Sequence, residues 1–203
     1  MTKLLHDQAS EASFHLLNHK VISFPTETVM GLAVVYNDFE AYNLLNKVKR
    51  RPEDKPYTLM LGNVLDIQKY GYVDKKIQKI IDAFMPGSIT ILIKGNENLP
   101  NWVTHGSPIV GLRVPSNKEA LEVLKEVKLP LLVPSANRSG EKPCLDSEEV
   151  KKVFGDEVAY VVEGKANLEK PSTIVDLTKE SPFILREGPI SLEDILKVWE
   201  GND

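Results

Sequence analysis

The fold is decided by residues 21–35, which read VISFPTETVMGLAVV. Residues 21–24 form a short, largely apolar run that predicts a strand ending at Pro25. Residues 31–35 resume the apolar pattern and predict a second strand after a polar turn. A 3.6-residue apolar period then runs from 39 to 49. Because strands and helices alternate in this way, the sequence predicts an α/β layered domain.

The same alternation continues outward to both ends of the chain. Helices are expected over residues 7–18, 39–49, 64–70, 75–84 and 117–126, and from 147 and 191 onward. Strands are expected over 57–61, 89–94, 109–114, 129–133, 160–162, 173–176 and 183–185. Since no internal repeat or long linker interrupts the pattern, residues 1–203 are expected to form a single domain.

The composition restricts the class of protein. Apolar residues make up 42% and charged residues 27% of the 203 residues, as in an ordinary soluble protein. The net charge of −4 argues against nucleic-acid binding by bulk electrostatics. Cys144 is the only cysteine, so an intrachain disulfide and a zinc ribbon are excluded. With neither a signal-peptide pattern nor a membrane-length apolar run, a cytoplasmic protein without membrane association is expected.

Any basic site must therefore be local, and Lys49-Arg50-Arg51-Pro52 is the first candidate. One interpretation is a solvated helix end, where cations offset the helix dipole. The other is a phosphate site, because arginine supplies planar donors and lysine a point charge. Pro52 and the second Lys55-Pro56 pair favour the phosphate site, since they indicate a loop that holds its charges outside a regular element.

A second polar segment, Pro134-Ser135-Ala136-Asn137, follows the predicted strand 129–133. It is rich in turn-forming residues, and a plain turn is one interpretation. Ser135 and Asn137 also provide neutral donors and acceptors that can bind a ribose or a phosphate. Together with the basic cluster, they suit one anionic, polar ligand such as a nucleotide.

Polar side chains also mark the ends of other predicted strands. Thr26, Arg113, Ser172 and Arg186 each lie at such a position, where α/β sheets place their binding sites. An arginine at the end of a buried strand is unfavourable unless it meets an anion. Other chemistries find no support: the chain has no P-loop, GxGxxG or GxSxG motif, and its four histidines lack metal-ligand spacing.

Taken in order, these residues resemble the YrdC-like family, the threonylcarbamoyl-AMP synthases that start threonylcarbamoyladenosine synthesis on tRNA. The resemblance spans residues 24–188 and suits the short form without a C-terminal extension. Met30 stands where the family usually has tyrosine, and Glu187 where it usually has proline. The matching motifs are Phe24-Pro25-Thr26-Glu27-Thr28-Val29, Lys49-x-Arg51-Pro52 with Lys55-Pro56, Pro86-Gly87, Arg113-Val114-Pro115, Ser135-Ala136-Asn137 with Ser139-Gly140, Ser172-Thr173-Ile174-Val175-Asp176 and Leu185-Arg186-Glu187-Gly188.

The resemblance implies a twisted mixed sheet flanked by helices, with a deep, positively charged concave cleft. It implies a nucleotidyltransferase that makes threonylcarbamoyl-AMP and pyrophosphate from L-threonine, bicarbonate and ATP. The nucleotide would be held by Lys49, Arg51, Ser135, Asn137 and Arg186, and the threonine with its carbamate by Thr26, Thr58, Arg113 and Ser172. Mg²⁺ would enter with ATP, held mainly by phosphates and water. A tRNA threonylcarbamoyl transferase complex would receive the product, with a weak direct tRNA contact as a further expectation.

Neither chemical step needs an enzyme nucleophile, so no catalytic residue is expected beyond positioning and charge stabilisation by Lys49 and Arg51. Two alternatives stay open. One is an RNA-binding or ribosome-maturation module that uses the same cleft for a phosphate backbone, which the net charge of −4 disfavours. The other is the YciO-like branch of the fold with a different substrate; the intact Lys49-x-Arg51-Pro52 and Ser135-Ala136-Asn137 motifs favour the synthase branch instead.

Overall fold

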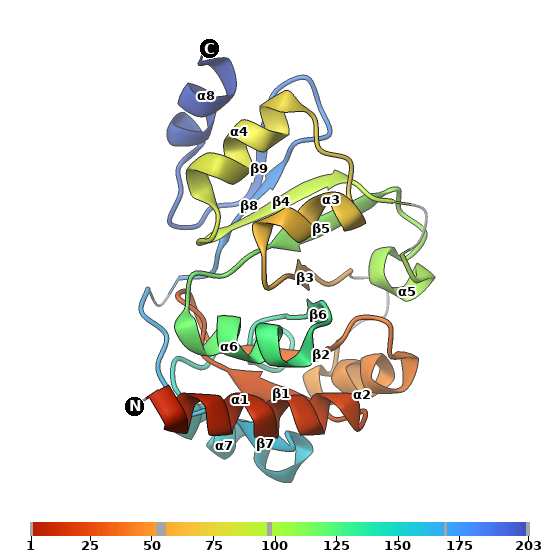
Figure 1. The fold of residues 1–203 in the computed structure, drawn as a ribbon, viewed down its shortest axis with the longest axis vertical. Helices are drawn as coiled ribbons and strands as arrows, with labels where there is room; N and C mark the ends of the chain where they lie inside the picture. The colour runs from red at the N-terminus through yellow and green to blue at the C-terminus, as the bar shows by residue number, and fades with distance from the viewer. Residues whose placement is uncertain (1, 52–55, 97–98, 169, 202–203) are drawn as a thin grey trace.

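The computed structural model of the chain describes residues 2–51, 56–96, 99–168 and 170–201. Within these residues the strands form one nine-stranded sheet in the order β7-β1-β2-β6-β3-β5-β4-β8-β9 (Figure 1). Three neighbouring pairs, β7/β1, β3/β5 and β4/β8, are parallel and the others antiparallel, which confirms the predicted mixed sheet. The strands are β1 (Ile22–Phe24), β2 (Gly31–Val35), β3 (Leu59–Met60), β4 (Ile89–Lys94), β5 (Ile109–Arg113), β6 (Leu131–Leu132), β7 (Tyr160–Val161), β8 (Thr173–Asp176) and β9 (Phe183–Arg186).

Most of the longer helices begin at a polar cap. Asp38, Asp74, Asn117, Asp146 and Ser191 each accept a backbone N–H of the first turn, which satisfies a donor that has no partner inside the helix. None of the described helices combines the length and the apolar character needed to cross a bilayer. The helices are α1 (Thr2–Leu17), α2 (Phe39–Lys49), α3 (Ile67–Tyr70), α4 (Lys75–Phe84), α5 (Asn101–Thr104), α6 (Lys118–Val127), α7 (Ser147–Phe154) and α8 (Leu192–Glu200), with 3₁₀ turns at Val64–Asp66 and Gly155–Glu157.

Some elements differ in extent from the predicted ones. The first helix begins at Thr2 rather than near residue 7. The predicted strand 57–61 is reduced to Leu59–Met60, the two residues that pair with both β5 and β6. Helix α5 was not predicted, because four residues are too few to show a helical period.

The two faces of the sheet explain how residues 21–35 determine the fold. Along β2, Leu32 and Val34 face a core that includes α2, α4, α7 and α8. Ala33 and Val35 point the other way, into a core built with α1 and α6. Every β2 residue is buried, so helices cover both faces of this strand. In Figure 1, α1 and α6 lie together over this part of the sheet.

The other part of the sheet leaves room for a site. Ile89, Ile91 and Ile93 of β4 point into the core shared with α4 and α8. Because side chains alternate along a strand, Thr90 points to the opposite face, where it lines a pocket. Thr90 is only 1% exposed, so this hydroxyl lies at the buried base of that pocket.

Candidate functional site

The pocket on this face of the sheet gathers residues from segments far apart in the sequence. It encloses about 160 Å³, less than the roughly 300–1,000 Å³ typical of sites for drug-sized ligands. Its enclosed part therefore suits a small ligand. The described lining residues are Thr28, Val29, Arg51, Pro56, Tyr57, Thr58, Thr90, Arg113, Val133, Pro134, Ser135, Pro171, Ser172, Ile174 and Arg186.

The structure brings most of the predicted site residues together. Those that line the pocket are Arg51, Thr58, Arg113, Ser135, Ser172 and Arg186. Thr26, Lys49 and Asn137 do not line it, but each is hydrogen-bonded to a residue that does. Pro52 and Lys55, which belong to the predicted basic loop, lie outside the described residues. The net positive charge of the cleft stays a prediction.

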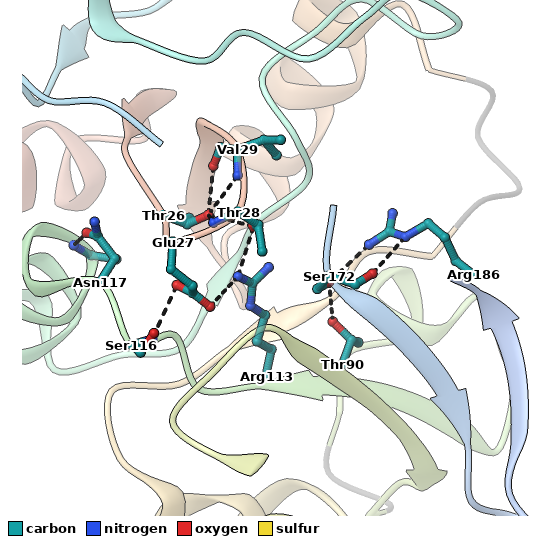
Figure 2. A network of polar contacts seen from close by, with 11 residues as sticks. Thr26, Glu27, Thr28, Val29, Thr90, Arg113, Ser116, Asn117, Ser172 and Arg186 are labelled. Carbon is teal, nitrogen blue, oxygen red and sulfur yellow. Dashed lines mark hydrogen bonds and ion pairs between the residues drawn. The ribbon is translucent and has the colours of Figure 1, made fainter. Parts of the chain in front are cut away.

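Thr26 organises the turn between β1 and β2. Its Oγ1 donates to the carbonyl of Val29 at 2.7 Å and accepts the backbone N–H groups of Thr28 and Val29 at 3.1 and 3.3 Å. The same oxygen lies 2.8 Å from Oγ1 of Thr28. Figure 2 shows these contacts closing the turn around Thr26. Thr28, rather than Thr26, is therefore the threonine of this turn that lines the pocket.

Arg113 ends β5 and is joined to this turn by a buried ion pair. Its Nη2 donates to Oε1 of Glu27 at 2.6 Å and to Oγ1 of Thr28 at 3.0 Å. The other oxygen of Glu27 accepts the backbone N–H of Ser116 at 3.2 Å. Nε of Arg113 is buried without a hydrogen-bond partner among the described residues. A buried cationic donor in that state favours a ligand that brings an acceptor.

A second arginine lies across the pocket. Arg186, at the end of β9, donates through Nε to the carbonyl of Ser172 and through Nη2 to Oγ of Ser172, both at 3.0 Å. Ser172 Oγ lies 3.1 Å from Oγ1 of Thr90. Desolvation lowers the pKa of Arg186, and the positive charge of Arg113 lowers it further. An anion between the two guanidinium groups would relieve this repulsion.

Arg51 covers a third side of the pocket. Its guanidinium carbon lies 4.4 Å from the centre of the Tyr57 ring, a cation–π arrangement, and its Nη2 donates to the carbonyl of Pro56. The Tyr57 hydroxyl donates to Oδ1 of Asn46 at 2.6 Å, which ties this wall to α2. Arg50, between the two predicted ligands, is the exposed left-handed cap of α2, so the helix-end interpretation holds for Arg50.

Lys49 is buried behind the pocket rather than exposed in it. The residue is 2% exposed, and its ammonium donates to the carbonyls of Ser135 and Asn137 at 2.6 and 2.8 Å. A third contact reaches Oδ1 of Asn137 at 3.4 Å. These contacts match the three donors of an ammonium group. Lys49 therefore stabilises the 135–137 loop by binding its backbone carbonyls.

The loop has further supports. Ser135 Oγ donates to Oδ1 of Asn137 at 2.6 Å, and Nδ2 of Asn137 donates to the carbonyls of Arg138 and Glu141. Arg138 is buried, donates to the carbonyls of Val48 and Val153, and forms an ion pair with Glu157. The two predicted motifs thus form one unit, in which the end of α2 holds the Ser-Ala-Asn loop.

Met30 joins the first turn to the same unit. Its backbone N–H donates to the carbonyl of Cys144 at 3.0 Å, and its carbonyl accepts the N–H of Ala136 at 2.7 Å. The Met30 side chain is fully buried in the core. Methionine at this position thus packs into the core, and the backbone contacts do not depend on the side chain.

Burial lowers the pKa of Lys49 to about 7, and the positive charge of Arg51 acts in the same direction. Above about pH 7 the folded chain releases this proton, whereas the unfolded chain keeps it up to the ordinary value of 10.5. Because the unfolded state then binds more protons, the free energy of unfolding rises with pH in this window. We predict this rise in urea denaturation of the wild type and its absence in Lys49→Met. Parallel pH profiles for the two proteins would contradict it.

Sequence patterns missed several of the pocket's polar residues. Thr28 lines the pocket, and Glu27 supports Arg113, whereas the sequence assigns a site role only to Thr26 of this turn. Thr90 is a buried hydroxyl between Ile89 and Ile91, and that exception within an apolar run is a signal that could have identified it. The sequence predicts Tyr57 only as a strand residue, yet its ring packs against the Arg51 guanidinium.

A putative threonylcarbamoyl-AMP synthase from Methanocaldococcus jannaschii is 30% identical over 184 residues, covering 90% of this chain and 86% of the relative. The crystal structure of Pyrococcus abyssi Sua5 complexed with L-threonine superposes with a TM-score of 0.91 and 28% identity. This alignment covers 95% of this chain but 57% of Sua5, so the chain spans little more than half of that protein.

The YciO branch is also close. Crystalline Escherichia coli YciO superposes with a TM-score of 0.86 and 26% identity, covering 94% of this chain and 93% of YciO. The family model described as Telomere recombination, which represents the Sua5, YciO and YrdC proteins, matches residues 15–188. Because this match covers most of the sequence, and the fold and the arrangement of the motifs agree with it, the chain belongs to the Sua5/YciO/YrdC family.

Proposed function

We propose that the chain is an L-threonylcarbamoyl-AMP synthase, which joins L-threonine, bicarbonate and ATP to give threonylcarbamoyl-AMP, pyrophosphate and water. The observation that carries this proposal is the pocket in which Arg51, Arg113 and Arg186 converge with five serine and threonine side chains. Guanidinium groups bind carboxylate and phosphate oxygens, and the hydroxyls supply neutral hydrogen bonds. The synthase names of relatives such as the Methanocaldococcus jannaschii protein agree with this chemistry.

The enclosed part of the pocket would hold threonine and its carbamate. Arg113, Thr58 and Ser172 line the pocket and would contact this ligand, and Thr28 would take the role that the resemblance gives to Thr26. The nucleotide would extend along the open side, over Arg51, Ser135 and Arg186. Lys49 and Asn137 would act through the loop that they support. The structure of Sua5 complexed with L-threonine supports a small amino-acid site on this fold.

The chemistry requires positioning rather than a protein nucleophile. The threonine amine attacks bicarbonate and water leaves, which gives the carbamate. A carbamate oxygen then attacks the α-phosphorus of ATP, and the bond to pyrophosphate breaks. Both steps bring negative groups together, so fixed arginines that neutralise this charge would lower the barrier.

A divalent cation would accompany ATP. The described lining residues offer hydroxyl oxygens but no carboxylate, a donor set that suits Mg²⁺ held mainly by phosphates and water. When bound, Mg²⁺ would neutralise the charge of the departing pyrophosphate. The product would serve threonylcarbamoyladenosine formation on tRNA, passed to a tRNA threonylcarbamoyl transferase complex. A weak direct contact with tRNA remains a prediction of the resemblance alone.

Pyrophosphate release from ATP by purified protein tests the proposal. We expect release that requires both L-threonine and bicarbonate and falls to background when either is left out. Threonylcarbamoyl-AMP should appear in equal amount in the same reaction by mass spectrometry. Release that continues without threonine would contradict the proposal. No release under any condition would instead favour a YciO-like protein with another substrate, the second candidate that the similarity to YciO supports.

A further inference from the structure

Glu27 is a buried carboxylate whose position needs an explanation. It lies in the turn between β1 and β2, is 7% exposed, and binds Arg113 at the end of β5 with one oxygen and Ser116 just after β5 with the other. Oε1 accepts from Arg113, and Oε2 accepts the N–H of Ser116. Removing a carboxylate from water is unfavourable unless such partners compensate. Glu27 therefore connects two parts of the chain separated by 86 residues.

Glu27 itself does not reach the pocket, because the residues that line it include Thr28 and Arg113 but not Glu27. Its carboxylate is also committed to two donors, so it is badly placed to act as a general base. The residue on which it acts is Arg113. Figure 2 shows the Arg113 guanidinium with Glu27 and Thr28 on one side and Ser172 and Arg186 on the other.

The contacts of Arg113 are unevenly distributed. Within the described residues, its guanidinium donates only through Nη2, to Glu27 and to Thr28. Nε is buried and has no partner within the described part of the chain. The positive charge of Arg186 across the pocket disfavours this placement of Arg113. Without Glu27, repulsion and side-chain entropy would both move the guanidinium away.

We propose that Glu27 is a positioning residue, which holds the Arg113 guanidinium by Nη2 so that its remaining donors meet the anionic groups of the substrate. This inference rests on the proposed function and assigns a role to a residue outside the pocket. The carbamate of threonine carries two carboxylate-type groups, and two arginines facing each other suit such a ligand. Glu27 keeps one of these arginines in place when the pocket is empty.

The test compares steady-state kinetics of Glu27→Gln with the wild type. Glutamine keeps the size of the side chain but removes its charge. We expect KM for L-threonine to rise by about tenfold or more, because a charge-assisted contact is lost at the threonine end. KM for ATP should stay within about twofold, since Arg51 and Ser135 are untouched. Equal changes in both KM values, or none in either, would overturn the proposal.

Asp176→Asn is the matched control. Asp176 is also buried, at 8% exposure, and its Oδ1 accepts from the N–H and the hydroxyl of Thr178, away from the pocket. The Asp176→Asn variant is expected to have a lower melting temperature than the wild type, while its KM values for L-threonine and for ATP stay unchanged. If Glu27→Gln does not fold, Glu27→Asp is used instead. Aspartate retains the charge, but its side chain is one methylene shorter. The same unequal effect on the two KM values is expected.

A measurement without substrate separates this proposal from the proposed function. In ¹⁵N NMR of the arginine side chains, rotation of the Arg113 guanidinium should be hindered in the wild type and faster in Glu27→Gln. Arg113→Lys assigns the signal by its disappearance. Equal hindrance in both proteins would contradict a positioning role. A wild type without threonine-dependent turnover would refute the synthase assignment, and the NMR comparison would still decide the role of Glu27.

Discussion

Replacing Arg113 with alanine is expected to reduce threonine-dependent pyrophosphate release by about a hundredfold or more. The same change leaves the Glu27 carboxylate buried without its cationic partner. Breaking a buried ion pair in this way destabilises a protein by about 3–5 kcal/mol. Initial rates at saturating ATP measure the first effect, and urea denaturation measures the second.

A double variant separates the two effects. In Arg113→Ala with Glu27→Ala, no unpaired carboxylate remains, so part of the lost stability should return. Activity should not return, because the guanidinium is still missing. The double-mutant cycle then gives the coupling energy of the pair. Recovery of activity in the double variant would show that Arg113 acts only through stability.

The second large effect is expected for Gly188→Ala. A Cβ built on Gly188 would lie 2.1 Å from the backbone nitrogen of Thr173 and 2.5 Å from the carbonyl carbon of Ser172. These are backbone atoms and cannot rotate away, so the segment after β9 must move from the start of β8. Overpacking of this kind destabilises by about 1–3 kcal/mol. Since Arg186 is held by Ser172, turnover should fall as well.

Gly95→Ala is the control for this prediction. The same Cβ at Gly95 would first meet Cδ1 of Leu99 at 3.3 Å and the side chain of Val110 at 3.5 Å. The end of a leucine side chain can adjust, and Gly95 does not line the pocket. We expect a melting temperature close to that of the wild type and unchanged kinetics. Similar losses in both variants would show that the contacts of Gly188 have no special role.

Much of the fold followed from local pattern. The strands predicted at residues 21–24, 31–35, 89–94 and 109–114 are present within one residue at each end, and the helix predicted at 39–49 is α2 with the expected bounds. Short elements were less accurately predicted. Strand β3 keeps two of five expected residues, because its length depends on pairing with β5 and β6 and not on its own sequence.

The candidate site was likewise only partly predictable from the sequence. By itself, the sequence determined which segments carry polar and cationic side chains at strand ends. Such residues stand out next to apolar runs, because a polar group beside a buried strand needs a partner. Only the tertiary structure decided how each side chain is used. Lys49 and Asn137 support a loop, Thr26 closes a turn, and Glu27 and Thr90 enter the network of the pocket. The roles of Lys49, Glu27 and Thr90 depend on contacts between residues more than 80 positions apart, such as Arg113 with Glu27. Local periodicity records which way a side chain points along its own element, but not the partner that the folded chain brings to it.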